Sequence, residues 1–251
     1  MKQLRFRAFL LALTFSVGAI SPAVAHQPVF LDSSTNKVER SPVLVDGTVS
    51  FAVTADFAKA AEIKHFRFAL KQDEPLKLEY LILDRKPENS LSNAKLPQVT
   101  LKSPSGKSIT LRINERTKFY EPFGRKNYLF LSRMSRAGEP GIYTVTIRAR
   151  AKSSLIVAVG SSEVRGEVMN IATGAGNCPQ KISNEIEVTQ KRAEQLVGLS
   201  ERAGELCAAL NGWDFRTVQR DGEDFAVTMD YRSNRVNVKV AEDRIFEVTV
   251  G

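Results

Sequence analysis

Short alternating segments separated by turn signals run through residues 43–168, and this spacing constrains the fold more than any other feature of the chain. Apolar and polar residues alternate in the segments 49–53, 65–70 and 76–83, which is typical of strands with one face in a core. Turns are predicted at Asp73-Glu74-Pro75 and at Ser103-Pro104-Ser105-Gly106. In the second turn Pro104 presets φ and Gly106 supplies a positive φ. Further strand segments are 98–102, 108–113, 128–131, 142–150 and 155–159. About eight or nine short strands predict an all-β sandwich of jelly-roll type, with a short helix only at 55–63.

The pattern changes near the C-terminus, where helical segments precede three strands. A first helical stretch is predicted over residues 184–196. A second begins after Ser200, a favoured N-cap residue, and ends at Asn211-Gly212. Strands are predicted at 215–219, 235–240 and 245–250. This half is therefore expected to be a small α+β domain with one main helix on a small sheet.

Charge divides the chain at the same place. Residues 26–170 carry 23 Lys and Arg against 15 Asp and Glu, a net of +8, whereas residues 171–251 carry 10 against 13, a net of −3. The predicted division is a β-sandwich domain at 26–169, a Gly-, Ala- and Asn-rich linker at 170–183 and an α+β domain at 184–251. The basic excess indicates a solvated surface or attraction to an anionic cell-wall polymer. No nucleic-acid-binding module is present in the sequence, so nucleic acid is not an expected partner.

The first 25 residues resemble a secretory signal peptide. Lys2, Arg5 and Arg7 precede the apolar run 8–20, and Ala23-Val24-Ala25 is the small-residue pattern of a cleavage site. The mature chain is expected to begin at His26 and to be secreted or periplasmic. The most apolar later stretch, 155–159, is too short to span a membrane. The protein is expected to be a monomer.

Cys178 and Cys207 are the two cysteines of the chain. An even count in an oxidising compartment favours a disulfide. The bond would close a loop of about 30 residues and stabilise the fold by about 3–4 kcal/mol in the chain-entropy model. Two buried free thiols are the alternative.

Catalytic motifs are missing from the sequence, so no enzyme and no cofactor are expected. No Gly-x-Ser-x-Gly segment occurs, and two histidines leave little for a Ser-His-Asp hydrolase. The histidines allow another hypothesis. A free α-amine on His26, its imidazole and the imidazole of His65 would together offer three nitrogen ligands to copper. A copper-binding protein is therefore an alternative.

Three segments of the sandwich resemble small β-sandwich modules appended to secreted bacterial peptidases. These segments are Phe66-Arg67-Phe68, Ser103-Pro104-Ser105-Gly106, and the alternating run from Gly141 to Ile147. The resemblance implies a binding role for this domain, such as recognition of a cell-surface ligand.

The last quarter of the chain carries four landmarks in order: Leu196-Val197-Gly198 before a Ser-capped helix, Val227-Thr228-Met229-Asp230-Tyr231-Arg232, Arg235-Val236-Asn237-Val238, and Val250-Gly251. In this order and spacing they are similar to the potato inhibitor I family, which includes the eglins and the barley chymotrypsin inhibitor, and to its bacterial relatives. The resemblance implies a serine-protease inhibitor that inserts an exposed reactive loop, Val227 to Arg232, into its target. The scissile bond would be Met229–Asp230.

Further expectations follow from the resemblance. An unbranched apolar side chain at Met229 suits a subtilisin- or chymotrypsin-like protease. The family supports its loop from the strand below, where this chain has Arg235 and Asn237; Arg235 is expected to donate to Thr228 or Asp230. Asn237 replaces an arginine common in plant and leech members, and the approach at 220–225 is longer than usual, so a looser loop is expected. The alternative function is a non-inhibitory extracellular binding protein.

Overall fold

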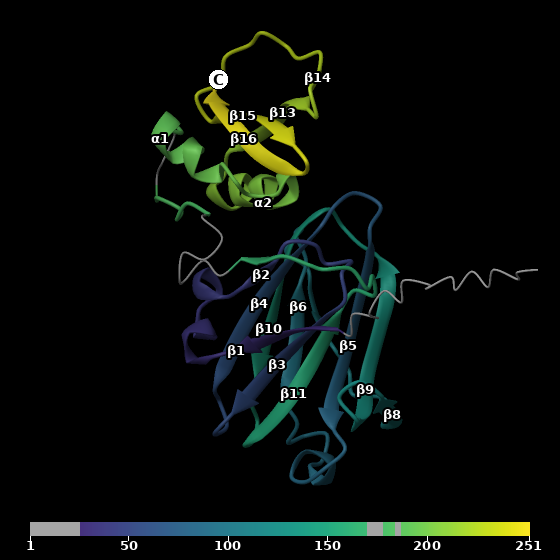
Figure 1. Cartoon of the computed structure of the whole chain (residues 1–251). Coiled ribbons are helices and arrows are strands. Elements are labelled where there is room, and N and C mark those ends of the chain that lie inside the picture. Colours follow the sequence, from purple (N-terminus) through teal and green to yellow (C-terminus); the bar gives the residue numbers. More distant parts are fainter. Residues whose placement is uncertain (1–25, 170–177, 184–186) are drawn as a thin grey trace, which may run out of the picture.

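The computed structural model describes residues 26–169, 178–183 and 187–251 (Figure 1). The predicted signal peptide and residues 170–177 of the predicted linker lie outside the described residues. Within the described residues, no helix is both long and apolar enough to cross a membrane.

Six strands form the first sheet, in the order β1-β3-β11-β5-β9-β8. Their bounds are β1 Gln27–Leu31, β3 Phe51–Phe57, β5 Pro75–Leu83, β8 Thr117–Glu121, β9 Lys126–Ala137 and β11 Ser153–Val159. β1 pairs with β3 in parallel, and the other neighbours pair antiparallel. β8 therefore lies at one edge of this sheet, beside β9.

Six more strands form the second sheet, in the order β12-β2-β4-β10-β6-β7. Their bounds are β2 Val43–Leu44, β4 Ile63–Leu70, β6 Gln98–Lys102, β7 Ser108–Thr110, β10 Gly141–Arg148 and β12 Val168–Met169. Short 3₁₀ helices lie at Ser33–Asn36, Val38–Arg40 and Glu88–Ser90. Because consecutive strands usually belong to different sheets, the chain passes repeatedly over the core between them.

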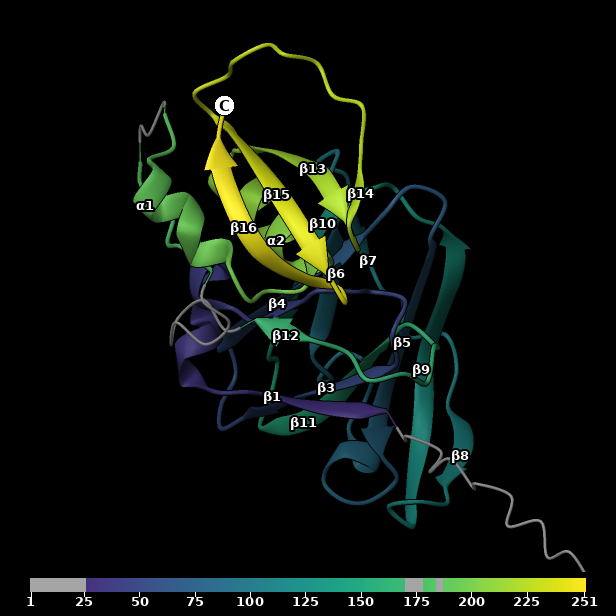
Figure 2. The same ribbon diagram turned by 45° about the horizontal axis from the view of Figure 1, so that its top comes forward.

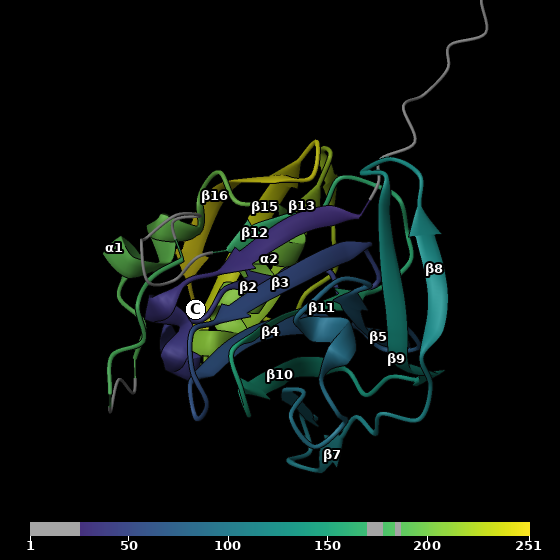
Figure 3. The same ribbon diagram turned by 90° about the horizontal axis from the view of Figure 1, so that it is seen from below.

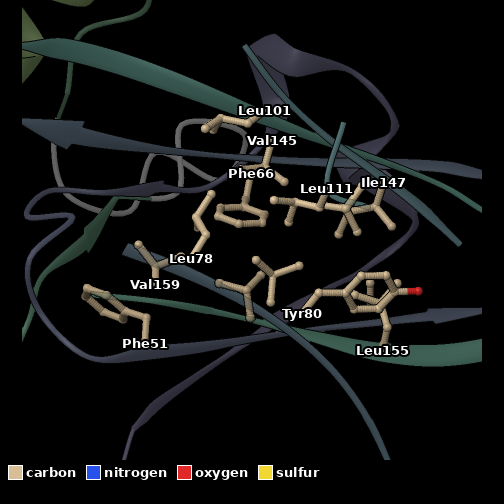
Figure 4. Packing of buried hydrophobic residues seen from close by; sticks show 14 of the residues in the cluster. Phe51, Phe66, Leu78, Tyr80, Leu101, Leu111, Val145, Ile147, Leu155 and Val159 are labelled. Atoms are coloured by element: carbon tan, nitrogen blue, oxygen red, sulfur yellow. The ribbon is translucent and has the colours of Figure 1, made fainter. Parts of the chain in front are cut away.

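A large apolar core fills the space between the two sheets (Figure 4). Phe51 and Val159 contribute from the first sheet, and Phe66 and Val145 from the second. Tyr80 is fully buried, and its hydroxyl donates to the carbonyl of Pro97 at 3.0 Å, so the polar end of this ring is satisfied. The β-rich, two-sheet expectation for residues 26–169 agrees with this architecture.

The helix predicted at 55–63 is wrong. Ala55 and Phe57 end β3, and Ile63 begins β4. Ala55 and Phe57 continue the buried positions of that strand, which pairs with β1 on one side and β11 on the other. Alternation and ladder hydrogen bonds on both edges outweigh the helix propensity of an Ala-rich segment.

The C-terminal part contains a four-stranded sheet in the order β14-β13-β15-β16. The bounds are α1 Gln190–Ala193, α2 Glu201–Asn211, β13 Asp214–Arg220, β14 Glu223–Asp224, β15 Arg235–Ala241 and β16 Arg244–Val250, with a 3₁₀ turn at Glu194–Leu196. The Ser200 hydroxyl caps α2 by accepting from the Ala203 N–H, and Gly212 ends it with φ +81°. The first predicted helix is shorter than expected, and residues 184–186 lie outside the described residues.

α2 lies between the C-terminal sheet and the sandwich (Figures 1 and 2). The second apolar cluster of the structure includes Val43, Val45 and Met169 from the sandwich together with residues of α2 and its sheet. The two halves therefore share buried apolar surface. The division into two domains remains a hypothesis from the sequence.

A disulfide joins Cys178 to Cys207, with the two Cα atoms 5.5 Å apart. Cys207 belongs to α2, and the Asn211 side chain of the same helix donates to the carbonyl of Pro179 at 3.0 Å. The described end of the segment predicted as a linker is thus attached to α2 by a covalent bond and a buried hydrogen bond.

Candidate functional site

An exposed loop at residues 221–234 connects β13 to β15 and forms the arch at the top of Figure 2. β13 and β15 pair in parallel, so the chain must return the full length of the sheet between them. In most parallel pairs a helix makes this return. Here a non-helical segment that includes the short strand β14 makes it, and every residue from Asp221 to Arg232 is exposed.

The loop begins with a tight hairpin. Asp221 and Gly222 have φ of +50° and +85°, as in the turn that joins two twisted antiparallel strands. β14 pairs with the end of β13, and the Phe225 N–H donates to the Val218 carbonyl at 2.9 Å. The long approach at 220–225 was expected to loosen the loop. In the structure these residues form a hydrogen-bonded hairpin, and the looser loop stays a prediction.

Met229 is the most exposed of the large apolar residues in the loop. Its side chain is 98% exposed, and that of Tyr231 is 73% exposed. Apolar side chains of this size are normally at least half-buried in a folded protein. Their display on a loop supported by the sheet marks this face as a candidate contact surface.

Arg235 supports the C-terminal side of the Met229–Asp230 bond from the first position of β15. Its side chain is only 7% exposed. One guanidinium nitrogen donates to the Asp230 carboxylate at 3.2 Å, another donates to the Asp230 carbonyl, and Nε donates to Gly251 O at 2.8 Å. The expected Arg235–Asp230 contact is present, and Gly251 O fixes the other edge of the guanidinium.

Arg216, on β13, supports the other side of the same bond. Its Nη1 donates to the Thr228 carbonyl at 3.0 Å and approaches the Thr228 hydroxyl at 3.3 Å. Its Nε donates to Oδ1 of Asn237 at 2.7 Å. Asn237 in turn donates to Gly251 O at 2.7 Å. Asn237 therefore orients Arg216 and makes no hydrogen bond of its own to residues 227–232 among those the structure describes.

Asp230 is the point at which these side chains converge. The Thr228 hydroxyl donates to one of its carboxylate oxygens, and Arg232 donates to the other at 2.9 Å. Hydrogen bonds from Thr228 and Arg235 hold the pKa of this carboxyl well below its ordinary value. The carboxylate stays charged in acidic solution, so its bonds across Met229 persist there.

Sequence reasoning identified Arg235 and Asn237 and missed Arg216. A signal for Arg216 was present: in the parallel ladder it is the residue paired with Asn237. That pairing depends on the register of β13 and β15, which alternation alone does not provide. Arg232 was placed in the loop, but its bridge to Asp214 of β13, at 3.4 Å, was not foreseen.

The two histidines are not brought together. Nδ1 of His26 contacts the Ser50 hydroxyl, just before β3, whereas Nδ1 of His65 lies 3.0 Å from the Thr146 hydroxyl in the second sheet. Lys64, next to His65, donates to the carbonyl of Leu31 at the far end of β1 from His26. The described residues hold no group of three His, Cys, Asp or Glu side chains placed for a metal.

A cavity of about 740 Å³ lies at the end of the sandwich remote from α2. Its lining includes two basic residues, Lys64 and Lys152, and three acidic residues, Asp56, Glu62 and Glu88. Glu88 is buried and accepts from the Ser154 N–H at 3.0 Å. These opposed charges do not select one class of ligand.

No protein-family model matches the sequence. No curated protein matches it either.

Proposed function

We propose that this protein inhibits an extracellular serine protease by presenting the Met229–Asp230 bond on its exposed loop. The observation that carries the proposal is the pair of arginines on adjacent strands. Arg216 bonds to the residue before Met229, and Arg235 bonds to the residue after it. Each side of the proposed scissile bond thus has its own attachment to the sheet.

Such double attachment distinguishes an inhibitor from a substrate. A flexible peptide loses conformational entropy when a protease binds it, and its two new ends separate after cleavage. A loop already restrained in its bound shape binds at lower entropic cost. Ends that remain attached to β13 and β15 stay beside each other, so the bond can re-form before either end leaves the protease.

Specificity follows from the side chain that enters the protease pocket. Met229 is apolar, unbranched and 98% exposed, which suits the apolar pockets of subtilisin- and chymotrypsin-like proteases. A trypsin-like pocket contains a carboxylate that Met cannot pair with. The resemblance of residues 195–251 to the potato inhibitor I family agrees with this choice of target.

The test is a titration of subtilisin, chymotrypsin and trypsin with the chain from His26 onward. We expect stoichiometric inhibition of one or both of the first two enzymes and little of trypsin. Met229→Lys should transfer inhibition toward trypsin by at least about a hundredfold, because the pocket carboxylate gains a cation. Phe246→Lys is the matched control, since Phe246 is 49% exposed on β16 and lies outside the loop.

Two outcomes would contradict the proposal. One is a wild-type chain that blocks none of the three enzymes at micromolar concentration. The other is rapid cleavage of Met229–Asp230 without inhibition, which would make the loop a substrate. In either case a non-inhibitory binding protein would become the better hypothesis.

A further inference from the structure

The hairpin that joins β8 to β9 exposes two large aromatic rings among cations. Phe123 is 79% exposed and Tyr120 is 55% exposed. Lys118, Arg125 and Lys126 are exposed on the same hairpin. Glu121 is the one acidic residue in the sequence from 117 to 137. We call residues 118–126 the basic tip.

Two backbone N–H groups of the basic tip are hydrogen-bonded within the tip itself. The Glu121 carboxylate accepts from the Phe123 N–H at 2.7 Å and from the Gly124 N–H at 2.5 Å. These two N–H groups therefore need no water, and moving the turn into a less polar medium does not leave them unsatisfied. The same bonds direct the acidic charge toward the backbone of the turn, so the cations are the free charges of the basic tip.

The basic tip and the exposed loop lie at opposite ends of the molecule. Glu74, just before β5, bonds to Arg202 of α2, whereas Leu83, at the end of β5, pairs with Tyr128 beside the tip. β5 has nine residues, so these points are separated by roughly 30 Å at about 3.3 Å per residue. Figures 1 and 2 show β8 far from the exposed loop, and Figure 3 shows β8 at the outer edge of its sheet.

The exposed chemistry favours a lipid surface over a sugar. Sugar rings stack on open aromatic platforms, and the rings that form a face here, Phe119, Tyr128 and Phe130, are only partly exposed. The Arg133 guanidinium lies over Phe130, 4.8 Å from its centroid, and covers part of that face. A protruding ring beside cations instead matches the membrane interface, where aromatic side chains and Lys or Arg lie at the headgroup level.

We propose that the basic tip docks this protein on an anionic lipid surface. Phe123 enters the headgroup region, and Lys118, Arg125 and Lys126 lie over the lipid phosphates. Residues 26–170 add a net charge of +8, which attracts the sandwich to the same surface from a distance. The exposed loop then faces away from the lipid. This proposal does not depend on inhibition by that loop.

The experiment uses the chain from His26 onward and vesicles of phosphatidylglycerol and phosphatidylcholine, with pure phosphatidylcholine as the neutral arm. We expect co-sedimentation with the anionic vesicles only, weakened by raising NaCl from 0.05 to 0.5 M. Arg125→Asn with Lys126→Gln should weaken partitioning by about 25-fold. Asn is chosen because it tolerates the positive φ of 52° at Arg125.

Matched controls separate the basic tip from general charge and apolarity. Lys102→Gln with Lys107→Gln removes the same charge from β6 and its turn and should change partitioning by less than about threefold. Phe123→Ser should weaken binding by about tenfold, whereas Phe30→Ser, at a ring 73% exposed on β1, should not. Phe123→Trp should show a blue-shifted emission with anionic vesicles, read against the buried Trp213.

Equal binding to neutral vesicles, or no binding to either kind, would overturn the proposal. So would pelleting that Phe123→Ser and the tip cation variant leave unchanged. If a soluble anionic polysaccharide binds as tightly as the vesicles and Phe123→Trp does not shift, the tip recognises anionic glycan and the lipid proposal is wrong.

Discussion

At Asp230, three arginines meet one carboxylate. Arg235 and Arg232 donate to it, and Arg216 lies 3.9 Å from it while bonding to Thr228. A single exposed ion pair contributes little to stability, but hydrogen bonds to charged groups with fixed partners contribute more. Arg235 is almost fully buried, and Arg216 is oriented by Asn237. We therefore expect these two side chains to restrain the loop more than Arg232 does.

Arg216→Ala should convert the proposed inhibitor toward a substrate. Loss of its bonds to Thr228 is expected to weaken inhibition by about 10- to 100-fold and to accelerate cleavage of Met229–Asp230. The cleavage rate is read by mass spectrometry after incubation with subtilisin. Lys239→Ala is the control, since Lys239 pairs with Glu247 on the same sheet without contacting the loop. Unchanged cleavage together with an unchanged unfolding midpoint would remove Arg216 from this role.

Among the elements, α2 lies close to its sheet because of Gly204. A Cβ built at Gly204 would lie 2.3 Å from Cδ1 of Ile245 and 3.3 Å from the ring of Phe215. Gly in the middle of a helix costs about 1 kcal/mol relative to Ala. Glycine at this position lets the backbone of α2 approach β16 closely, which offsets that cost. The sheet below the loop therefore depends on a small residue at one helical position.

Gly204→Ala should lower the free energy of unfolding by about 1–2 kcal/mol, because overpacking exceeds the gain in helix propensity. Adding Ile245→Val, which deletes the clashing Cδ1, should restore part of this loss. Urea unfolding of the two single variants and the double variant measures the coupling. Additive effects within about 0.3 kcal/mol would show that the predicted clash relaxes elsewhere.

At the scale of the whole molecule, Arg202 links the two halves. It donates to both carboxylate oxygens of Glu74, at 2.8 and 2.6 Å, and to the carbonyl of Val45 at 3.1 Å, and it pairs with Asp46 at 2.9 Å. Burial alone would raise the pKa of Glu74, but hydrogen bonds from the Arg202 side chain and from the Lys71 N–H, together with the charges of both residues, keep it below 4.5. The link lies beside the apolar surface that the halves share.

The contribution of this link to the free energy of unfolding should decrease as the pH falls. A carboxyl whose pKa is lower in the folded protein stabilises the fold above its ordinary pKa of 4.5 and loses that contribution as pH falls through the folded value. Glu74→Gln should therefore destabilise the protein by about 1–2 kcal/mol at pH 7 and by progressively less below pH 4.5. Urea unfolding followed by the fluorescence of Trp213 measures this difference.

Glu205→Gln is the control for Glu74. Glu205 pairs with Lys71 across the same interface at 2.9 Å, but both side chains are about half exposed. Its substitution should lower the free energy of unfolding by less than about 1 kcal/mol. It should leave the decrease in stability below pH 4.5 as in the wild type. An identical pH profile for Glu74→Gln and the wild type would show that Glu74 does not carry the acid dependence.

Alternation, caps and turn residues predicted much of the secondary structure, because these signals act between neighbours in the chain. The ends of α2 followed from Ser200 and Gly212, and β4, β5, β6 and β10 followed from their alternation. β1, β2, β8, β12 and β14 were missed, since each is short or is defined by the strand it pairs with. The helix predicted at 55–63 failed for the same reason, because pairing of β3 on both edges decided its conformation.

The sequence predicted an exposed loop at residues 227–232, with an apolar residue at Met229 and Arg235 close behind the loop. The side chains that support that loop became visible only in the folded chain. The parallel register of β13 and β15 places Arg216 beside Asn237, and the C-terminal strand brings Gly251 under Arg235. The tertiary structure also packs α2 against the sandwich, through Arg202 and a shared apolar core. These contacts join residues distant in the chain, and local sequence patterns carry no information about such pairings.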